Sequence, residues 1–241
     1  MFTDKIESED FSKMPEEYRT LLSRVLRIQA DFEIGGPHLY VSQWLLSAPS
    51  AEEQWKVAKT AAEEIEHFHK INQLLNQIGM DASDRLFVQK ADRYVDAFRQ
   101  EMPTWADWAV FGMLIDRVGQ YQLDEFVDCS YLPLARLLSP HDNQILEEEQ
   151  GHVNLGLLKV MELGRSDEGR EQVQAAVNRW YVTALDMFGR TESRRSRSYI
   201  EWGIKRRANL EARDEYIAEV NPILEKLGLD IPDADEGRKF V

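Results

Sequence analysis

The sequence contains the motif Glu-x-x-His twice, as Glu64-Ile-Glu-His67 and as Glu149-Gln-Gly-His152. Residues three apart on an α-helix project from the same face, so each motif presents a carboxylate beside an imidazole. These two groups are ligands that suit iron and manganese. In ferritin-like di-metal bundles, two helices each carry such a motif and two others each add one inward carboxylate. The sequence therefore predicts a centre for two metal ions, provided that two further acids face inward.

Helical periodicity separates the first motif from the overlapping pair Glu66 and His69. The face through Glu64 is apolar, with Val57, Ala61, Phe68, Ile71, Leu75 and Ile78 at helical spacing. The face through Glu66 is polar, with Lys59, Lys70 and Gln73, which is typical of a solvated surface. We therefore expect Glu64 and His67 to point inward and His69 to lie at the surface.

The same comparison favours Glu149 among the acids of the second motif. Its neighbours at helical spacing are Ile145, Leu146, Val153 and Val160. Glu147 shares a polar face with Asn143, Gln150 and Asn154. Glu148 lies between the two faces, so we expect it behind the metal ligands rather than among them.

Two further acids complete the predicted set. Glu33 has Tyr40 and Trp44 on its side of the helix, whereas Asp31 shares a face with Arg27 and is expected to be solvated. In residues 105–129, Asp116 has the most apolar neighbours, and Glu125 is the alternative. A carboxylate centred on an apolar face is costly to bury unless it is paired or binds a metal. The competing interpretation is that each acid is paired with a Lys or Arg in the core.

Most of the chain follows the helical period. Helices are expected over residues 14–46 (interrupted at Gly35-Gly36-Pro37), 51–78, 86–98, 105–129, 142–163, 168–188 and 207–227. Ser50, Thr104 and Asp142 are the expected N-caps of three of them. The predicted fold class is all-α, a ferritin-like four-helix bundle with additional C-terminal helices, and residues 1–241 are expected to form one ferritin-like di-iron domain.

Composition argues against several other classes of protein. The net charge of −14 disfavours nucleic-acid binding. No apolar run approaches the roughly 18–20 residues that a bilayer span needs, so no membrane association is expected. The N-terminus has no apolar signal segment, and a single cysteine, Cys129, fits a reducing compartment, so a cytoplasmic location is expected.

At these residues the chain resembles the catalytic A subunits of ring-1,2-phenylacetyl-CoA epoxidases, a family of multicomponent bacterial di-iron monooxygenases. The resemblance runs from about Met14 to Asp233 and includes EIGG, EEIEH, LIDRVG, SYLPLAR and EEEQGH. The iron ligands of that family fall on Glu33, Glu64, His67, Asp116, Glu149 and His152. The resemblance therefore implies the same six residues that the helical faces select.

The resemblance also implies an activity and its requirements. Such a protein uses two irons to activate O₂, with an iron–manganese pair as the alternative, and epoxidises the aromatic ring of an acyl-CoA thioester. Electrons would come from NADPH through a separate flavin and iron–sulfur reductase. A non-catalytic ferritin-like sister subunit is the expected partner, with a homo-oligomer as the alternative. Two other functions fit the residues: a ferritin-like protein that stores or oxidises iron, and a structural subunit that supports a partner.

Basic residues cluster in one part of this acidic chain. Seven lie within residues 190–207: Arg190, Arg194, Arg195, Arg197, Lys205, Arg206 and Arg207. Clusters of arginine recognise phosphate well, and a CoA thioester carries a 3′-phosphate and a diphosphate. Lys205, Arg206 and Arg207 are therefore candidates for contacts to the CoA phosphates. The alternative is a surface or interface patch that pairs with acids elsewhere.

Overall fold

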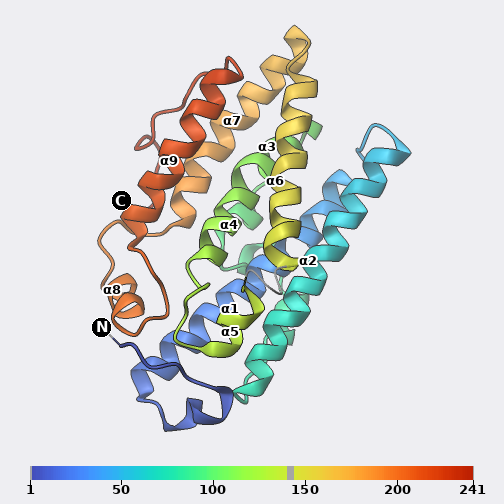
Figure 1. The fold of residues 1–241 in the computed structure, drawn as a ribbon. Helices are drawn as coiled ribbons and strands as arrows, with labels where there is room; N and C mark the ends of the chain where they lie inside the picture. The colour runs from blue at the N-terminus through green and yellow to red at the C-terminus, as the bar shows by residue number, and fades with distance from the viewer. Residues whose placement is uncertain (1, 140–143, 241) are drawn as a thin grey trace.

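Four long helical segments carry the predicted acids. The computed structural model describes residues 2–139 and 144–240, most of which are helical. α1 (Glu16–Leu39) and α2 (Ala51–Gln77) pack along each other, and α6 (Gln144–Leu163) packs on the segment that begins with α3 (Trp105–Phe111) (Figure 1). This arrangement is an all-α helical bundle, as the sequence predicts, and it is consistent with the ferritin-like architecture.

Two further helices follow the bundle in the chain and cover one side of it. α7 (Asp167–Met187) packs against α3, and α9 (Asn209–Lys226) contacts α4 (Arg117–Asp124) (Figure 1). Both begin and end within two residues of the expected positions. No helix in residues 2–139 and 144–240 is both long enough and apolar enough to cross a bilayer.

Side-chain caps explain where two of the long segments begin. The hydroxyl of Ser50 accepts a hydrogen bond from the backbone N–H of Glu53 at 3.2 Å at the start of α2. Thr104 caps α3 and exchanges hydrogen bonds with Asp107, which forms a capping box. Both of these predicted N-caps are confirmed. The third predicted cap, Asp142, lies outside the described residues.

Two π-helical turns interrupt the regular helices. One, Tyr40–Trp44, extends α1, and the other, Gly112–Asp116, joins α3 to α4. α1 runs through Gly35-Gly36-Pro37 without the expected interruption, because the ring of Phe98 packs directly over Gly35 and tertiary contacts hold the segment helical. π-Turns of this kind often occur at functional sites, and both of these lie beside predicted metal ligands.

Residues 83–99 do not form the helix expected over 86–98. They form three short 3₁₀-helices: Ser83–Phe87, Lys90–Asp92 and Asp96–Arg99. The backbone N–H of Tyr94 donates to Asp31 on α1 at 2.6 Å, and a helix interior would use that N–H internally. The expectation was wrong because this segment is shaped by its contacts with α1 rather than by its own periodicity.

The remaining helices are short, and they include a 3₁₀-helix near the N-terminus, Ser8–Lys13. α5 (Leu132–Leu137) has Pro133 in its first turn, and α8 (Arg194–Glu201) was not among the expected helices. The hydroxyl of Ser193 caps α8 by accepting from the backbone N–H of Ser196 at 3.1 Å. α8 therefore presents part of the basic stretch as a helix.

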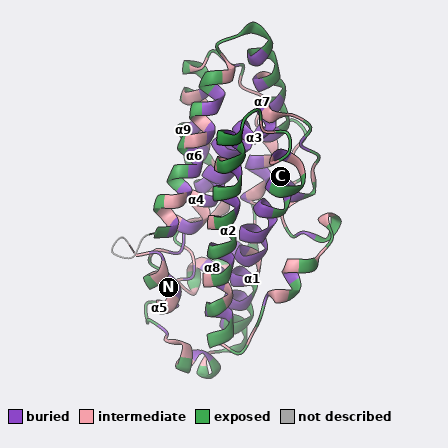
Figure 2. Cartoon of the chain, turned by 90° about the vertical axis from the view of Figure 1, so that its right-hand side faces the viewer, coloured by how far each residue is buried: buried purple, intermediate pink, exposed green. Residues whose placement is uncertain are grey.

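Apolar packing forms two clusters that meet along α1 and α2. Phe32 and Ala61 belong to one cluster, whereas Ala30, Ile34 and Phe68 belong to the other. Buried residues line the inner sides of the long helices, and exposed residues line much of the outer side of α2 (Figure 2). The predicted acids of α1 and α2 therefore lie between two apolar clusters and away from bulk water.

Candidate metal centre

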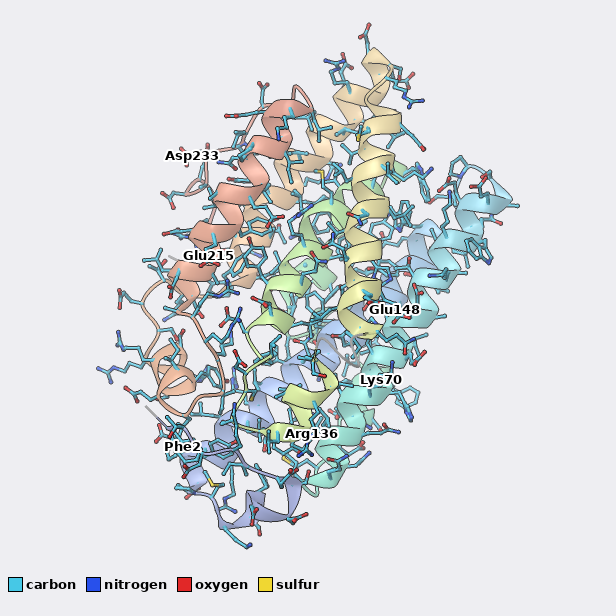
Figure 3. All side chains as sticks on the ribbon, in the orientation of Figure 1. Phe2, Lys70, Arg136, Glu148, Glu215 and Asp233 are labelled. Atoms are coloured by element: carbon cyan, nitrogen blue, oxygen red, sulfur yellow. The ribbon has the colours of Figure 1, made fainter. Side chains whose placement is uncertain are left out.

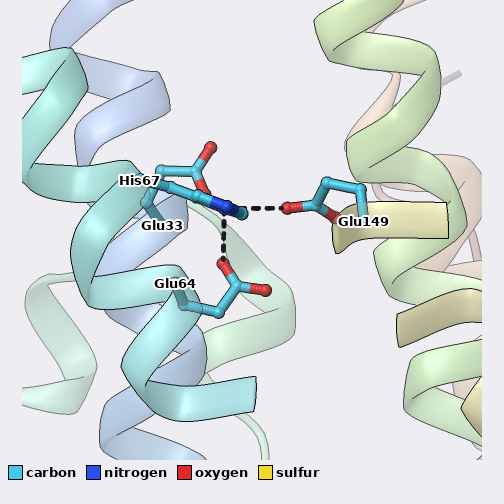
Figure 4. Close-up of side chains that lie close together, drawn as sticks. All are labelled: Glu33, Glu64, His67 and Glu149. Atoms are coloured by element: carbon cyan, nitrogen blue, oxygen red, sulfur yellow. Dashed lines mark ion pairs between the residues drawn. The ribbon is translucent and has the colours of Figure 1, made fainter. Parts of the chain in front are cut away.

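Four of the predicted ligands converge inside the bundle. Glu33, Glu64, His67 and Glu149 each offer one ligand atom, and these atoms all lie within 4.8 Å of one another. The Nδ1 atom of His67 is 3.4 Å from Oε2 of Glu33 and 3.3 Å from Oε1 of Glu149. Figure 4 shows α1 and α2 supplying three of these side chains while Glu149 approaches from α6. A group of this composition and spacing can hold a metal ion.

The other two predicted ligands lie next to this group. Nδ1 of His152 is 3.2 Å from Oε1 of Glu64, whose Oε2 is 4.0 Å from Nδ1 of His67. Glu64 therefore lies between the two imidazole rings, whose centroids are 6.4 Å apart. Asp116 is held by Tyr40, with 3.3 Å between the hydroxyl oxygen and Oδ1. All six predicted side chains are buried, and two of them lie outside the tight group of four.

Several inward-facing atoms of this centre have no hydrogen-bond partner among the described residues. They are Oε2 of Glu33, both carboxylate oxygens of Glu149, Nδ1 of His67 and Nδ1 of His152. Buried polar atoms in native proteins are nearly always satisfied, so this group of unpartnered lone pairs needs an explanation. Bound cations would satisfy all of these atoms at once. The residues therefore fit a metal centre.

The charges of the centre support the same conclusion. Burial and the neighbouring Glu149 raise the pKa of Glu64 well above its usual range, and burial does the same for Asp116. Burial alone would lower the pKa of His67, but the carboxylates of Glu149 and Glu33 outweigh it and raise that pKa to about 12. The carboxylates outnumber the imidazoles, and the raised pKa values mean that Glu64 and Asp116 retain protons without metal. Divalent cations would supply the missing positive charge.

Each histidine is also held from behind by an acid of the opposite helix. Nε2 of His67 is 2.9 Å from Oε2 of Glu148 on α6, and Nε2 of His152 is 3.1 Å from Oε2 of Glu63 on α2. Figure 3 labels Glu148 on the part of α6 that lies beside α2. Donation from Nε2–H to a carboxylate leaves Nδ1 facing the centre, where it would coordinate a metal once its proton is released. The contact with His152 also lowers the pKa of Glu63 to about 2.

The sequence predicted the place of Glu148 but not that of Glu63. The signal was present, because each Glu-x-x-His motif is preceded by another glutamate, at Glu63 and at Glu148. The two motifs are therefore Glu-Glu-x-x-His, and the first glutamate of each one serves the histidine of the other. Lys59 forms an ion pair with Glu63 and extends this chain of contacts toward the surface.

Close backbone contact fixes α6 against the π-turn that ends at Asp116. A Cβ on Gly156 would lie 2.4 Å from the backbone nitrogen of Met113, and a Cβ on Gly112 would lie 3.2 Å from Cα of Gly156. Only glycine allows this approach. It brings the second motif, on α6, within reach of Asp116.

The other acidic residues that were compared with the predicted ligands are not part of the centre. Asp31 was expected to be solvated, and that expectation was wrong: it is fully buried and paired with Arg85 and Arg93. Glu125, the alternative to Asp116, is buried with Arg207 as its own cationic partner. The residues expected at the surface are exposed: Glu66, His69 and Glu147.

Two of the three candidate phosphate ligands already have acidic partners. Arg206 forms an ion pair with Asp124, and Arg207 contacts Glu125 and, on α9, Glu215 (Figure 3). Lys205 differs from both. Its Nζ lies 6.0 Å from the ring centroids of Phe126 and Tyr199, and no carboxylate in the described part of the chain forms an ion pair with it.

An all-α bundle with a buried group of carboxylates and histidines defines a class of protein that can hold metal between its helices. Comparison with known proteins specifies the family. Residues 4–240 match the family of the phenylacetic acid catabolic protein, and the chain belongs to that family. The resemblance noted in the sequence motifs is thereby confirmed.

Two relatives illustrate the family. The chain is 30% identical over 236 residues to the A component of 1,2-phenylacetyl-CoA epoxidase from Escherichia coli (strain K12), a match that covers 95% of this chain and 74% of that protein. It is 25% identical over 230 residues to benzoyl-CoA oxygenase component B of Aromatoleum evansii, covering 82% of this chain and 47% of that protein. The chain thus spans about half of the second relative. By family, the chain is an oxygenase of the phenylacetate catabolic group.

Proposed function

We propose that this chain is the catalytic subunit of a multicomponent di-iron monooxygenase that epoxidises the aromatic ring of an acyl-CoA thioester such as phenylacetyl-CoA. The observation that carries the proposal is the convergence of Glu33, Glu64, His67 and Glu149, with unpartnered inward atoms, in a chain of this family. Asp116 and the second histidine would complete a set of six ligands. Residues 1–241 would then form one ferritin-like di-iron domain.

The six side chains would hold the two metals between the helices. Glu64 would be one of these ligands, since its Oε1 lies 3.2 Å from Nδ1 of His152 and its Oε2 lies 4.0 Å from Nδ1 of His67. When bound, two irons, or an iron–manganese pair, would supply the redox chemistry with O₂, for which NADPH provides electrons through a separate flavin and iron–sulfur reductase.

The protein's own contribution would be orientation and exclusion of water. Glu148 and Glu63 hold the two imidazole rings through Nε2, so that each ring turns the same nitrogen inward. The hydroxyl of Tyr40 fixes one oxygen of Asp116. The ring of Tyr40 stacks on Trp44, and Phe111 meets both edge-on, which closes this side of the centre to solvent.

Further protein components are part of the proposal. Both relatives are named as one part of a larger enzyme, the first as its A component and the second as component B. By analogy we propose two partners, a reductase and a homologous non-catalytic ferritin-like subunit, with a homo-oligomer as the alternative. The proposed location is the cytoplasm, where NADPH and CoA thioesters are available.

The decisive experiment supplies the iron-loaded chain and its co-purified subunits with NADPH, a reductase, ¹⁸O₂ and phenylacetyl-CoA or benzoyl-CoA. The proposal predicts a product that carries one ¹⁸O atom, and no product from the Glu149→Gln variant. Iron that is oxidised without any oxygenated aromatic product would instead indicate an iron-storing or iron-oxidising protein. A metal content near zero after iron loading would indicate a structural subunit.

A further inference from the structure

A groove of about 420 Å³ between α2 and α6 leads from the surface to the metal centre. The exposed Glu147 and the buried His152 both line it. Beside Asp116 lies a smaller pocket of about 10 Å³, which is room for about one water molecule. The groove and the pocket share the lining residues Thr60, His152 and Leu155. They therefore form one path, which we name the α2–α6 entrance.

One imidazole ring separates the α2–α6 entrance from the inward ligand atoms. Nε2 of His152 lies 3.1 Å from Oε2 of Glu63, which lines the groove, and Nδ1 of the same ring lies 3.2 Å from Oε1 of Glu64. Glu148 also lines the groove and lies 2.9 Å from Nε2 of His67. His152 is only 5% exposed, and its Nδ1 has no hydrogen-bond partner among the described residues. An ion held by the acids of the groove would therefore be one side chain away from its final ligands.

The α2–α6 entrance carries an excess of acid. Three carboxylates line it, those of Glu63, Glu147 and Glu148. Its two cations, Lys56 and Lys59, are already paired with glutamates of α2. Over residues 2–139 and 144–240, no lysine or arginine forms an ion pair with Glu147 or Glu148. Such an excess of negative charge raises the local concentration of divalent cations.

The cavity that reaches the centre at Gln29 has the opposite charge. Its volume is about 370 Å³, and Nε2 of Gln29 donates to Oε1 of Glu33 at 2.5 Å. No acid in the described part of the chain lines this cavity. The cations that line it are Arg24, Arg190, Arg195 and Lys205. Like charges repel, so this cavity opposes the entry of a metal cation, whereas the α2–α6 entrance favours it.

We propose that metal ions reach the centre through the α2–α6 entrance, where Glu147 and Glu148 bind the incoming divalent cation before His152 and the buried acids take it over. This inference rests on the proposed function in one respect, namely that the centre binds a divalent metal. Carboxylate oxygens and imidazole nitrogens along the path replace the water molecules of the hydrated ion in turn. Leu155 and Thr60 lie where the groove meets the pocket, so they control how fast the ion passes.

The first test measures how fast the metal-free full chain takes up Fe(II) without oxygen, by stopped-flow mixing with a chelator that reports the unbound ion. Leu155→Trp should slow the uptake at least about tenfold, because the ion could then pass only when the indole moves aside. The amount of iron bound at equilibrium should stay the same.

The matched control for this variant is Leu158→Trp. It adds the same side chain to the same helix, but Leu158 is 55% exposed and lines neither the groove nor the pocket. The control should take up iron at the rate of the unmodified chain. Thermal melts should show that both variants fold.

A charge reversal tests the acids without filling the path. Glu147→Lys should slow the uptake about 3- to 10-fold at low ionic strength, and the difference should shrink in about 1 M salt, which screens charges more than about 3 Å apart. Glu225→Lys is the control, since it makes the same change of net charge at an exposed position of α9 that does not line the entrance. Arg195→Glu, in the cavity at Gln29, should also leave the rate unchanged.

Either of two results would overturn the proposal. One is uptake by Leu155→Trp or by Glu147→Lys that is as fast as uptake by its control. The other is faster uptake by Arg195→Glu, which would place the route in the cavity at Gln29. Both results would leave iron content and product formation intact, so the proposed function would survive with a different route. Failure of the proposed function would appear differently, as uptake that the variants slow as expected in a chain that yields no oxygenated product.

Discussion

Asp31 and Glu33 are two residues apart on α1, and both are completely buried, yet their surroundings are opposite. Asp31 accepts hydrogen bonds from Arg85 at 3.0 Å and Arg93 at 2.9 Å, so its charge is neutralised by cations of the same chain. Glu33 faces other acids and a histidine, and its Oε2 has no hydrogen-bond partner among the described residues.

This difference shows how structural and functional acids can be told apart. Burial alone does not distinguish Asp31 from Glu33, and helical periodicity wrongly placed Asp31 at the surface. The distinction lies in whether the protein provides each acid with its own cation and fills all its hydrogen bonds. Asp31 stabilises the fold by fixing residues 83–99 on α1, whereas Glu33 belongs to a group in which the carboxylates outnumber the histidines.

The largest effect is expected from removing the charge of Asp31, the acid that has its own cationic partners. Asp31→Asn would leave two buried guanidinium groups without a carboxylate, which typically lowers the free energy of unfolding by about 3–5 kcal/mol. Chemical denaturation of the metal-free protein measures this loss in the free energy of unfolding. Asp84→Asn is the control, because its ion pair with Arg27 is at the surface and should contribute less than about 1 kcal/mol. Equal losses in the two variants would refute a structural role for Asp31.

The counterpart is Glu33→Gln, the same chemical change two residues away. The free energy of unfolding of the metal-free protein should change by less than about 1 kcal/mol, because the lost attraction to His67 is offset by relief of repulsion from the neighbouring acids. Iron affinity should fall about 100-fold, or about 2.7 kcal/mol, as measured by competition with a chelator. Glu147→Gln, an exposed acid on α6, should change neither quantity. If Glu33→Gln lowered the free energy of unfolding as much as Asp31→Asn does, the proposed difference between the two acids would be refuted.

A smaller loss is expected for the acids behind the histidines. Glu63→Gln and Glu148→Gln keep the hydrogen-bond geometry but weaken the acceptor, and such changes typically reduce metal affinity about 10- to 100-fold. Glu66→Gln is the matched control on α2, since Glu66 is exposed and contacts Lys70 instead. If all three variants bind iron equally well, the contacts of Glu63 and Glu148 with the histidines do not support metal binding.

The smallest effect concerns pH. The raised pKa values of Glu64 and Asp116 mean that these acids hold protons in the metal-free protein, and a metal must displace them. Iron binding should therefore tighten as the pH rises, by at most about tenfold per pH unit for each proton released. Titrations of the metal-free protein with iron at several pH values would measure this pH dependence of the affinity. An affinity that does not change with pH would show that the centre is already ionised.

The sequence predicted the buried acids better than their partners, for a physical reason. Whether a residue lies on the apolar face of a helix is local information, and Glu33, Glu64 and Glu149 could be read from it. The partners of Asp31 lie 54 and 62 residues further along the chain, one just before and one within residues 86–98, where a regular helix was wrongly expected. No local pattern could therefore reveal that Asp31 is buried.

Contacts between helices were equally hard to predict from the sequence. Glu63 meets His152 across 89 residues, and only the repeated glutamate before each motif hints at it. The π-turn that ends at Asp116 lies directly against Gly156 of α6, and no local pattern in the sequence predicts either the turn or the contact. The helices and their caps at Ser50 and Thr104 follow from local chemistry, and so they were predictable.

The most direct test is anomalous X-ray diffraction at the iron edge from crystals grown with Fe(II). A di-metal centre predicts two strong peaks inside the bundle, flanked by Glu33, Glu64, His67 and Glu149 and completed by Asp116 and His152. A map with no peak there, or with each of these acids turned to a lysine or arginine of its own as Asp31 is, would contradict it.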